Sequence, residues 1–215
     1  MAVLARRADR LQQLAEQIEA DGQKALVIEA DVSVEEHARG AVERTVSALG
    51  RLDTLVNNAG VMLLGPIEDA PLDEWRTMVH ANVFGVLYCT HAAVPVMKRQ
   101  GSGHIVNVSS VAGRFARAGS GVYNLTKFGV GAFSEALRQE TVALGLRVTV
   151  VEPGAVATEL PEHNRPEIRE QIMQRFGDTE RLEAHDIADA IAYIVTRPRH
   201  VAVNELLVRP TEQQA

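Results

Sequence analysis

Tyr123 and Lys127 stand four residues apart in the segment GVYNLTKFGV, a spacing that can perform acid–base chemistry. Residues four apart on an α-helix share one face, so a lysine ammonium can stabilise the phenolate and lower a tyrosine pKa from about 10. A tyrosine tuned in this way can pass a proton. Ser110, thirteen residues upstream, ends an apolar run that predicts a strand. Its hydroxyl can hydrogen-bond a substrate oxygen as charge develops there.

A Tyr-x-x-x-Lys motif also arises by chance, even in a chain with three tyrosines and three lysines. Other segments make chance a poor explanation here. Asn82 lies 28 residues before Ser110, the run VNNAG occupies residues 56–60, and Pro153-Gly154 comes shortly before Thr158. Together these segments resemble the short-chain dehydrogenase/reductase family.

The resemblance implies an oxidoreductase that transfers a hydride between NADP(H) and a carbonyl or secondary alcohol of a small substrate. Tyr123 would be the general acid and base, Ser110 would stabilise the reacting oxygen, and Lys127 would lower the tyrosine pKa and hold the nicotinamide ribose. Asn82 would help to hold a water on the route from the lysine to solvent. Its other interpretation is a helix-bend asparagine satisfied by its own backbone.

The resemblance also assigns residues at predicted strand ends to the cofactor. Arg6 and Arg7 follow the first strand, where members that prefer NAD(H) usually carry an acidic residue. Two guanidinium groups there imply the 2'-phosphate of NADP(H) instead, although exposed arginines are common at a helix start. Asp31 and Val32 match the position beside the adenine ring. Asp31 is equally a plausible N-cap for the helix that follows.

Two further turns complete the implied cofactor site beside Tyr123 and Lys127. The first follows the third strand, where small residues let the backbone approach the cofactor. The second follows the fifth strand and would turn over the nicotinamide, with a backbone group contacting the carboxamide and a threonine hydroxyl adding a hydrogen bond. The residues of these two turns are Asn58, Ala59, Gly60, Pro153, Gly154, Val156 and Thr158.

Composition favours a single cytoplasmic domain over residues 1–215. The hydrophobic fraction of 46% can build a full core. A net charge of -6 predicts no nucleic-acid partner, and the absence of a run of about 18 apolar residues predicts no membrane span. Cys89 lies in an apolar helical stretch and is interpreted as a buried thiol. The seven histidines show no metal-ligand spacing, so no metal site is predicted.

Short apolar runs alternate with longer amphipathic ones, which predicts an α/β fold: a doubly wound, Rossmann-type parallel sheet with helices on both faces. Ligands of such sheets bind outside the carboxyl ends of the strands. The predicted strands span residues 2–5, 25–29, 54–57, 104–108, 147–151 and 205–208. The predicted helices span about residues 8–20, 34–49, 72–99, 120–144, 165–176 and 185–196.

The sequence departs from the family at its beginning. The family opens with a strand and a glycine-rich turn that holds the cofactor diphosphate on a helix N-terminus. This chain opens on MAVLARRADRL, which matches the family's second strand. The sequence therefore predicts a fold that lacks the first strand–turn–helix unit, either as a fragment or through a misplaced start. Two strands would then be left beside an unfilled central position.

The remaining predictions concern the substrate and partners. Residues 159–183 match the family's substrate lid, and the tail VNELLVRPTEQ resembles a subgroup that acts on small 3-hydroxy acids and clavulanate-type aldehydes. Helices 72–99 and 120–144 are expected to form a homodimer or homotetramer, as they do in the family. An alternative function is a noncatalytic truncated homologue that serves as an oligomerisation partner through these helices.

Overall fold

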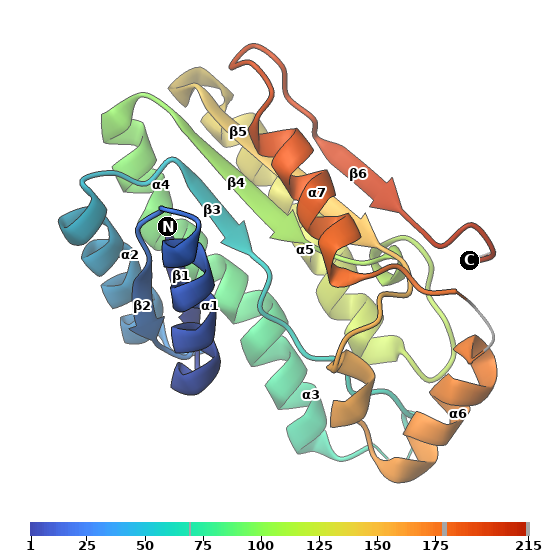
Figure 1. Ribbon diagram of the computed structural model, residues 1–215. Helices are drawn as coiled ribbons and strands as arrows, with labels where there is room; N and C mark the ends of the chain where they lie inside the picture. Colours follow the sequence, from blue (N-terminus) through green and yellow to red (C-terminus); the bar gives the residue numbers. More distant parts are fainter. Residues whose placement is uncertain (69, 178–179, 214–215) are drawn as a thin grey trace.

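The structure is a computed structural model that describes residues 1–68, 70–177 and 180–213. Short strands alternate with helices, as predicted (Figure 1). The strands are β1 (Ala2–Ala5), β2 (Leu26–Glu29), β3 (Thr54–Asn57), β4 (Gly103–Val108), β5 (Leu146–Pro153) and β6 (Glu205–Val208). The α-helices are α1 (Ala8–Ala20), α2 (Glu35–Leu49), α3 (Leu72–Val79), α4 (Gly85–Gln100), α5 (Gly121–Thr141), α6 (Pro166–Phe176) and α7 (Ala184–Val195).

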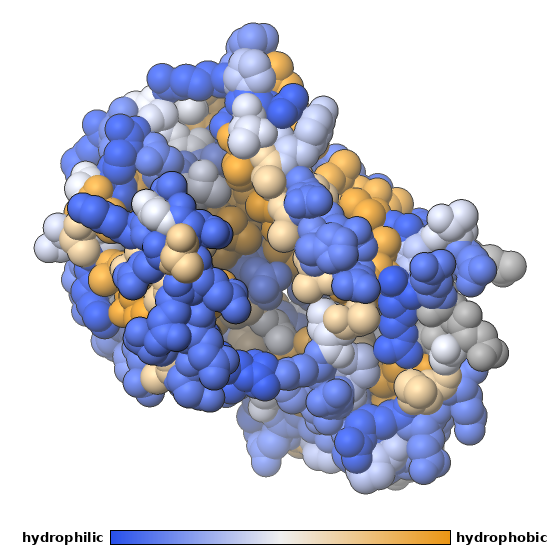
Figure 2. Space-filling view, in the orientation of Figure 1, coloured by the Kyte–Doolittle hydropathy of each residue, from blue (hydrophilic) through white to orange (hydrophobic). Residues whose placement is uncertain are grey.

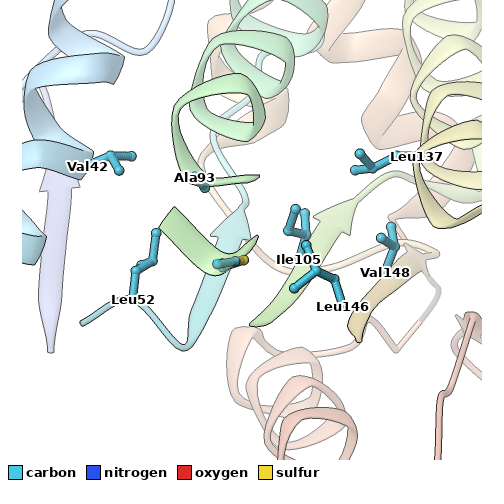
Figure 3. Packing of buried hydrophobic residues seen from close by; sticks show 8 residues of the cluster. Val42, Leu52, Ala93, Ile105, Leu137, Leu146 and Val148 are labelled. Carbon is cyan, nitrogen blue, oxygen red and sulfur yellow. The ribbon is translucent and has the colours of Figure 1, made fainter. Parts of the chain in front are cut away.

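One face of the sheet packs against α4 and α5. Successive residues of a strand point to opposite faces, so Ile105 on β4 and Val148 on β5 reach the same side. They join Ala93 of α4 and Leu137 of α5 in a buried cluster that also draws on α2 (Figure 3). Burial of these aliphatic side chains stabilises the position of α5, which carries Tyr123 and Lys127, and of α4 beside it.

The opposite face of the sheet packs against α7. Val106 on β4 lies beside Thr149 of β5, and Val151, two residues further along β5, points to the same side. Val106 and Val151 are both completely buried. They contact Ile187 and Ile194 from the apolar side of α7. Apolar residues on both sides of β4 and β5 explain why these strands read as continuous hydrophobic runs, and they confirm an α/β Rossmann-like fold with parallel strands.

The sheet divides between β1 and β3. β1 pairs with β2 alone, whereas β3, β4, β5 and β6 form a separate parallel sheet, and no ladder among the described residues joins the two. Figure 2 shows a hollow between these two parts, with hydrophobic residues in its wall. Val56 on β3 is 40% exposed, which is unusual for the apolar residue of a strand with a neighbour on each side. One edge of β1 and one edge of β3 thus have no strand partner among the described residues.

The predicted helix over residues 72–99 is interrupted. α3 and α4 are joined by the π-helical turn His80–Phe84, which contains Asn82. A π-turn inserts one residue into the helical ladder and often occurs at a functional site. The pattern of apolar residues did not reveal it because helical periodicity continues on either side of the insertion.

Taken together with its π-turn, the helical segment Leu72–Gln100 is long and apolar enough to cross a membrane, with a mean hydropathy of 1.2 in its most apolar 18-residue window. This differs from the sequence-based expectation that no stretch would qualify. About a third of that window is buried inside the fold, including the completely buried Ala93. α4 packs on α2, β3 and β4, so this helix contributes to the core.

Candidate active site

Tyr123 and Lys127 project from the same face of α5 toward the carboxyl end of β4. Both are buried, with 6% and 8% of their surface exposed. The Lys127 ammonium lies 5.8 Å from the centroid of the Tyr123 ring and donates a 3.0 Å hydrogen bond to the carbonyl of Val108, the last residue of β4. The predicted one-turn spacing therefore places the phenol and the ammonium together.

Ser110 reaches the same point from the loop after β4. Its backbone is extended, and its Oγ accepts a hydrogen bond from the Ala112 amide at 3.1 Å, which caps the short turn Val111–Gly113. The Ser110 side chain also hydrogen-bonds to Tyr123. The structure thus brings Ser110, Tyr123 and Lys127 into one cluster, as the sequence predicts.

The expected direction of the Tyr123 pKa was wrong. Burial raises the pKa of Tyr123 above its ordinary value, and the hydrogen bond from Ser110 only partly opposes this. Burial also lowers the pKa of Lys127 from 10.5 to about 8. Both shifts favour the neutral form of a group removed from water. At neutral pH the cluster therefore combines a protonated tyrosine with a lysine that is still mainly charged.

Asn82 joins the cluster to the loop after β3. Its Oδ1 accepts a hydrogen bond from the Val61 amide at 2.8 Å, and its Nδ2 donates to the Val61 carbonyl and to Thr126 Oγ1. The alternative of an asparagine satisfied by its own helix is therefore wrong. A Cβ on Gly60 would lie 3.1 Å from Asn82 Oδ1 and 3.8 Å from Lys127 Nζ, so only glycine fits comfortably beside the two side chains.

The residues after β1 and β2 lie apart from this cluster. Arg6 approaches Asp31 at 4.0 Å, whereas Arg7 bonds to Glu159. Asp31 accepts hydrogen bonds from the amide and hydroxyl of Ser33, and the N-cap of α2 is Val34. The interpretation of Asp31 as that helix N-cap is thus wrong.

Val32 packs against the start of α4. Its Cγ2 would lie only 2.8 Å from a Cβ placed on Gly85, so the glycine lets the two elements approach closely.

The predicted cofactor turns lie at strand ends. Asn58 and Ala59 are exposed directly after β3. Pro153 ends β5, and Gly154 donates a 2.7 Å hydrogen bond to the Val208 carbonyl.

The second turn leads into the predicted lid. Val156 forms an isolated parallel bridge with Leu182, and the exposed Thr158 accepts a hydrogen bond from the Leu160 amide at 3.3 Å. Because Val156 pairs with Leu182, the two ends of the predicted lid lie side by side after β5. Residues 178–179 of that lid lie outside the described residues.

Sequence reasoning missed Asn164 in the lid. This asparagine is buried, its Oδ1 accepts a 2.7 Å hydrogen bond from the Leu64 amide, and its Nδ2 donates to the Met62 carbonyl. It therefore fastens the lid to the loop after β3. The only local signal was a polar residue shortly before Pro166, which marks a turn but gives no partner.

Sequence reasoning also missed Arg10, which bonds to Glu159 together with Arg7. No group of three or more histidine, cysteine or acidic side chains within residues 1–68, 70–177 and 180–213 is arranged to hold a metal ion. The buried Cys89 has a pKa raised by burial to about 11, so it stays protonated and is a poor nucleophile.

A parallel α/β fold that carries a serine, a tyrosine and a lysine in contact beyond the carboxyl ends of its strands has the features of a Rossmann-like oxidoreductase. A family model of the short chain dehydrogenases matches residues 1–169. An uncharacterized oxidoreductase of Staphylococcus saprophyticus is 38% identical over 212 residues, which cover 97% of this chain and 85% of that protein. The chain belongs to the short-chain dehydrogenase/reductase family of oxidoreductases.

Solved structures agree with this family. The closed form of a serine dehydrogenase complexed with NADP+ superposes with a TM-score of 0.87 and 33% identity, covering all of this chain and 86% of that one. Serine dehydrogenase from Escherichia coli gives a TM-score of 0.82 and 30% identity, covering all of this chain and 88% of that one. A glycine betaine reductase of Emericella nidulans is 38% identical, with 99% of this chain matching 17% of that protein.

Proposed function

We propose that this protein transfers a hydride between NADP(H) and a carbonyl or secondary alcohol of a small substrate, with Tyr123 as the general acid and base. The observation that carries the proposal is the contact among Ser110, Tyr123 and Lys127 beyond the end of β4. A hydroxyl, a proton donor and a cation meet there at the edge where parallel sheets bind ligands.

Each side chain has a task that follows from its surroundings. Tyr123 is protonated at neutral pH, since burial raises a pKa that already lies at about 10, and it can donate this proton to the oxygen of a carbonyl. The Ser110 hydroxyl can hydrogen-bond that same oxygen and stabilise its developing charge. Lys127 places positive charge next to the phenolate that remains. The cofactor, when bound, supplies or accepts the hydride.

The residues present suit parts of NADP(H). Lys127 donates one hydrogen bond to the Val108 carbonyl, and its other N–H groups suit the hydroxyls of the nicotinamide ribose. Gly60 has no side chain to crowd the ammonium, because a Cβ there would lie 3.8 Å from Lys127 Nζ. Arg7, together with Arg10, suits the 2'-phosphate because guanidinium groups bind phosphate with directed hydrogen bonds. The complex of the similar serine dehydrogenase with NADP+ supports NADP(H) over NAD(H).

An assay of NADPH consumption tests this proposal. We expect turnover with small 3-oxo acids or short aldehydes, because the similar solved structures include serine dehydrogenases and serine is a small 3-hydroxy acid. The reverse reaction should reduce NADP+ with the matching 3-hydroxy acids. NADH in place of NADPH is the control and should support at least about tenfold less turnover, since it lacks the phosphate that two arginines bind. Equal rates with both cofactors would contradict the proposed preference.

The divided sheet favours a second candidate. As the alternative, we propose a noncatalytic protein that serves as an oligomerisation partner of a related chain. Among the described residues no ladder joins β1 to β3, and Val56 on β3 is exposed, which supports this alternative. Leu125 and Phe128, which are 65% and 43% exposed on α5, offer an apolar surface for association with a related chain.

Cofactor binding separates the two candidates. If the 215-residue chain acts as a noncatalytic partner, a thermal-shift titration with NADPH should leave its Tm unchanged within about 1 °C. A catalytic chain should show a rise of several degrees at 100 times Kd, because such binding adds about 2.7 kcal/mol of stability. ATP, which carries phosphate but no nicotinamide, is the control ligand. A rise with NADPH alone would refute the noncatalytic role.

A further inference from the structure

Two arginines at the start of α1, the N-cap residue Arg7 and Arg10 in the first turn, hold one carboxylate from a distant part of the chain. Arg7 Nη1 donates to Glu159 Oε2 at 2.9 Å, and Arg10 Nη1 donates to Glu159 Oε1 at 2.5 Å. The extended backbone of Arg7 and the first turn of α1 bring both guanidinium groups to the same carboxylate. Each guanidinium takes a separate oxygen, so the carboxylate of Glu159 is held from two sides. The third arginine nearby, Arg6, approaches Asp31 instead.

Arg7 and Arg10 form an anion-binding site in which a phosphate could replace the Glu159 carboxylate. The side chains of Arg7, Arg10 and Glu159 are 57%, 52% and 42% exposed, so solvent and solutes reach all three. Ion pairs this exposed contribute little to stability and are readily replaced. Guanidinium groups bind carboxylate and phosphate oxygens through the same kind of directed hydrogen bond, and a phosphate brings more negative charge.

Glu159 stands at the first residue of the predicted substrate lid. It directly follows Thr158, and the short turn Leu160–His163 begins with the next residue. Beyond that turn, Asn164 fastens the lid to the loop after β3, and the lid ends at Leu182, which pairs with Val156. A change of partner at Glu159 would therefore release the beginning of a segment whose other attachments stay in place.

We propose that Glu159 is an internal competitor for the anion site of Arg7 and Arg10, and that the 2'-phosphate of NADP(H) displaces it. This inference rests on the proposed function, because it takes the ligand from that reaction. In the free protein the carboxylate occupies the two guanidinium groups and ties the start of the lid to α1. Binding of the phosphate breaks both ion pairs, so cofactor binding and release of Glu159 are coupled. The coupling requires the 2'-phosphate on the adenosine, so it leaves NAD(H) unaffected.

Calorimetric titration with cofactor fragments tests the competition without requiring turnover. The probes are 2',5'-ADP, which carries the 2'-phosphate, and 5'-AMP, which lacks it. Glu159→Gln keeps the size of the side chain and removes its charge, and we expect it to tighten binding of 2',5'-ADP by about threefold to fivefold while 5'-AMP is unchanged. Arg10→Gln should weaken 2',5'-ADP by about tenfold. In the double variant, Glu159→Gln should lose most of its effect.

The matched control is Glu162→Gln, which removes a carboxylate from the same turn three residues later. It should leave both affinities unchanged, because a general change in net charge acts only weakly through salt. Inorganic phosphate at the same ionic strength should compete with 2',5'-ADP only weakly if the adenosine is also recognised.

Three outcomes would overturn the inference. These are equal effects of Glu159→Gln on both nucleotides, no effect of Arg10→Gln, or no binding of 2',5'-ADP by any variant at millimolar concentration. NADPH turnover without a Glu159 effect would refute the competition and leave the proposed reaction standing. A selective Glu159 effect without turnover would do the reverse.

Discussion

Replacing Tyr123 with phenylalanine is expected to lower kcat for NADPH-dependent carbonyl reduction by about 10²- to 10⁴-fold, the usual contribution of a general acid or base. The substitution removes only the phenolic oxygen, so the ring keeps its place in a site where it is 6% exposed. KM should change little, because the lost proton transfer acts in the transition state. Initial rates at saturating NADPH, followed by the loss of its absorbance, measure the effect.

Tyr193→Phe is the matched control for this variant. Tyr193 lies on α7, is 53% exposed and is far from the cluster in sequence and in fold, so its hydroxyl should not affect the rate. Tyr123→Phe also removes the hydrogen bond to Ser110, which costs about 1 kcal/mol of stability and leaves the protein folded. If the Tyr123 variant retained more than about a tenth of the wild-type kcat, another group would have to supply the proton.

The sequence was most informative where the relevant geometry is local. Tyr123 and Lys127 come together because they are one turn apart on α5, and helical spacing alone predicts that. Ser110 required one further step, since it follows a strand that the helix packs against. Its predicted position was right because the connection from β4 to α5 is short. The alternation of apolar residues likewise predicted the parallel α/β fold.

Contacts between distant segments were beyond the reach of such reasoning. Asn164 bonds to Met62 and Leu64, about a hundred residues away, and nothing in its local sequence distinguishes those partners. The bond from Arg10 to Glu159 joins residues 149 positions apart. Local periodicity carries no information on such pairs, so a charged residue on a helix reads only as solvated surface.

The sequence-based prediction that the Tyr123 pKa is lowered was wrong for a related reason. Sequence spacing shows that a cation is near the phenol, but it does not show how far both groups are removed from water. In the structure burial is the largest influence on each, and it favours neutral tyrosine and neutral lysine. The Lys127 ammonium, which was expected to lower the tyrosine pKa, is itself destabilised by removal from water.

The energetic cost of burying the Lys127 ammonium predicts that Lys127→Met will stabilise the protein at pH 7 and strongly reduce its activity. Burial lowers the lysine pKa from 10.5 to about 8, and at about 1.36 kcal/mol per pKa unit the charged form costs the folded state about 3 kcal/mol. Methionine has a similar length and no charge to bury. The lost hydrogen bond to the Val108 carbonyl offsets about 1 kcal/mol or more. We therefore expect a net gain of about 1–2 kcal/mol in urea unfolding, with turnover reduced by about 10²-fold or more.

The stability gain of Lys127→Met should depend on pH, because the lysine pKa differs between the folded and unfolded states. Between pH 8 and 10.5 the unfolded chain still holds the lysine proton that the folded protein has released, so the unfolded state binds more protons and stability rises with pH. Below pH 8 the lysine is charged in both states and its cost is fully present. The stability advantage of Lys127→Met should accordingly be largest at pH 7 and shrink toward pH 10.5. Lys98→Met, which removes an exposed lysine of α4, should show no such trend. A loss of stability at pH 7 would mean that the ammonium is a structural element of the fold, because a residue kept for catalysis at the expense of stability gives the opposite result.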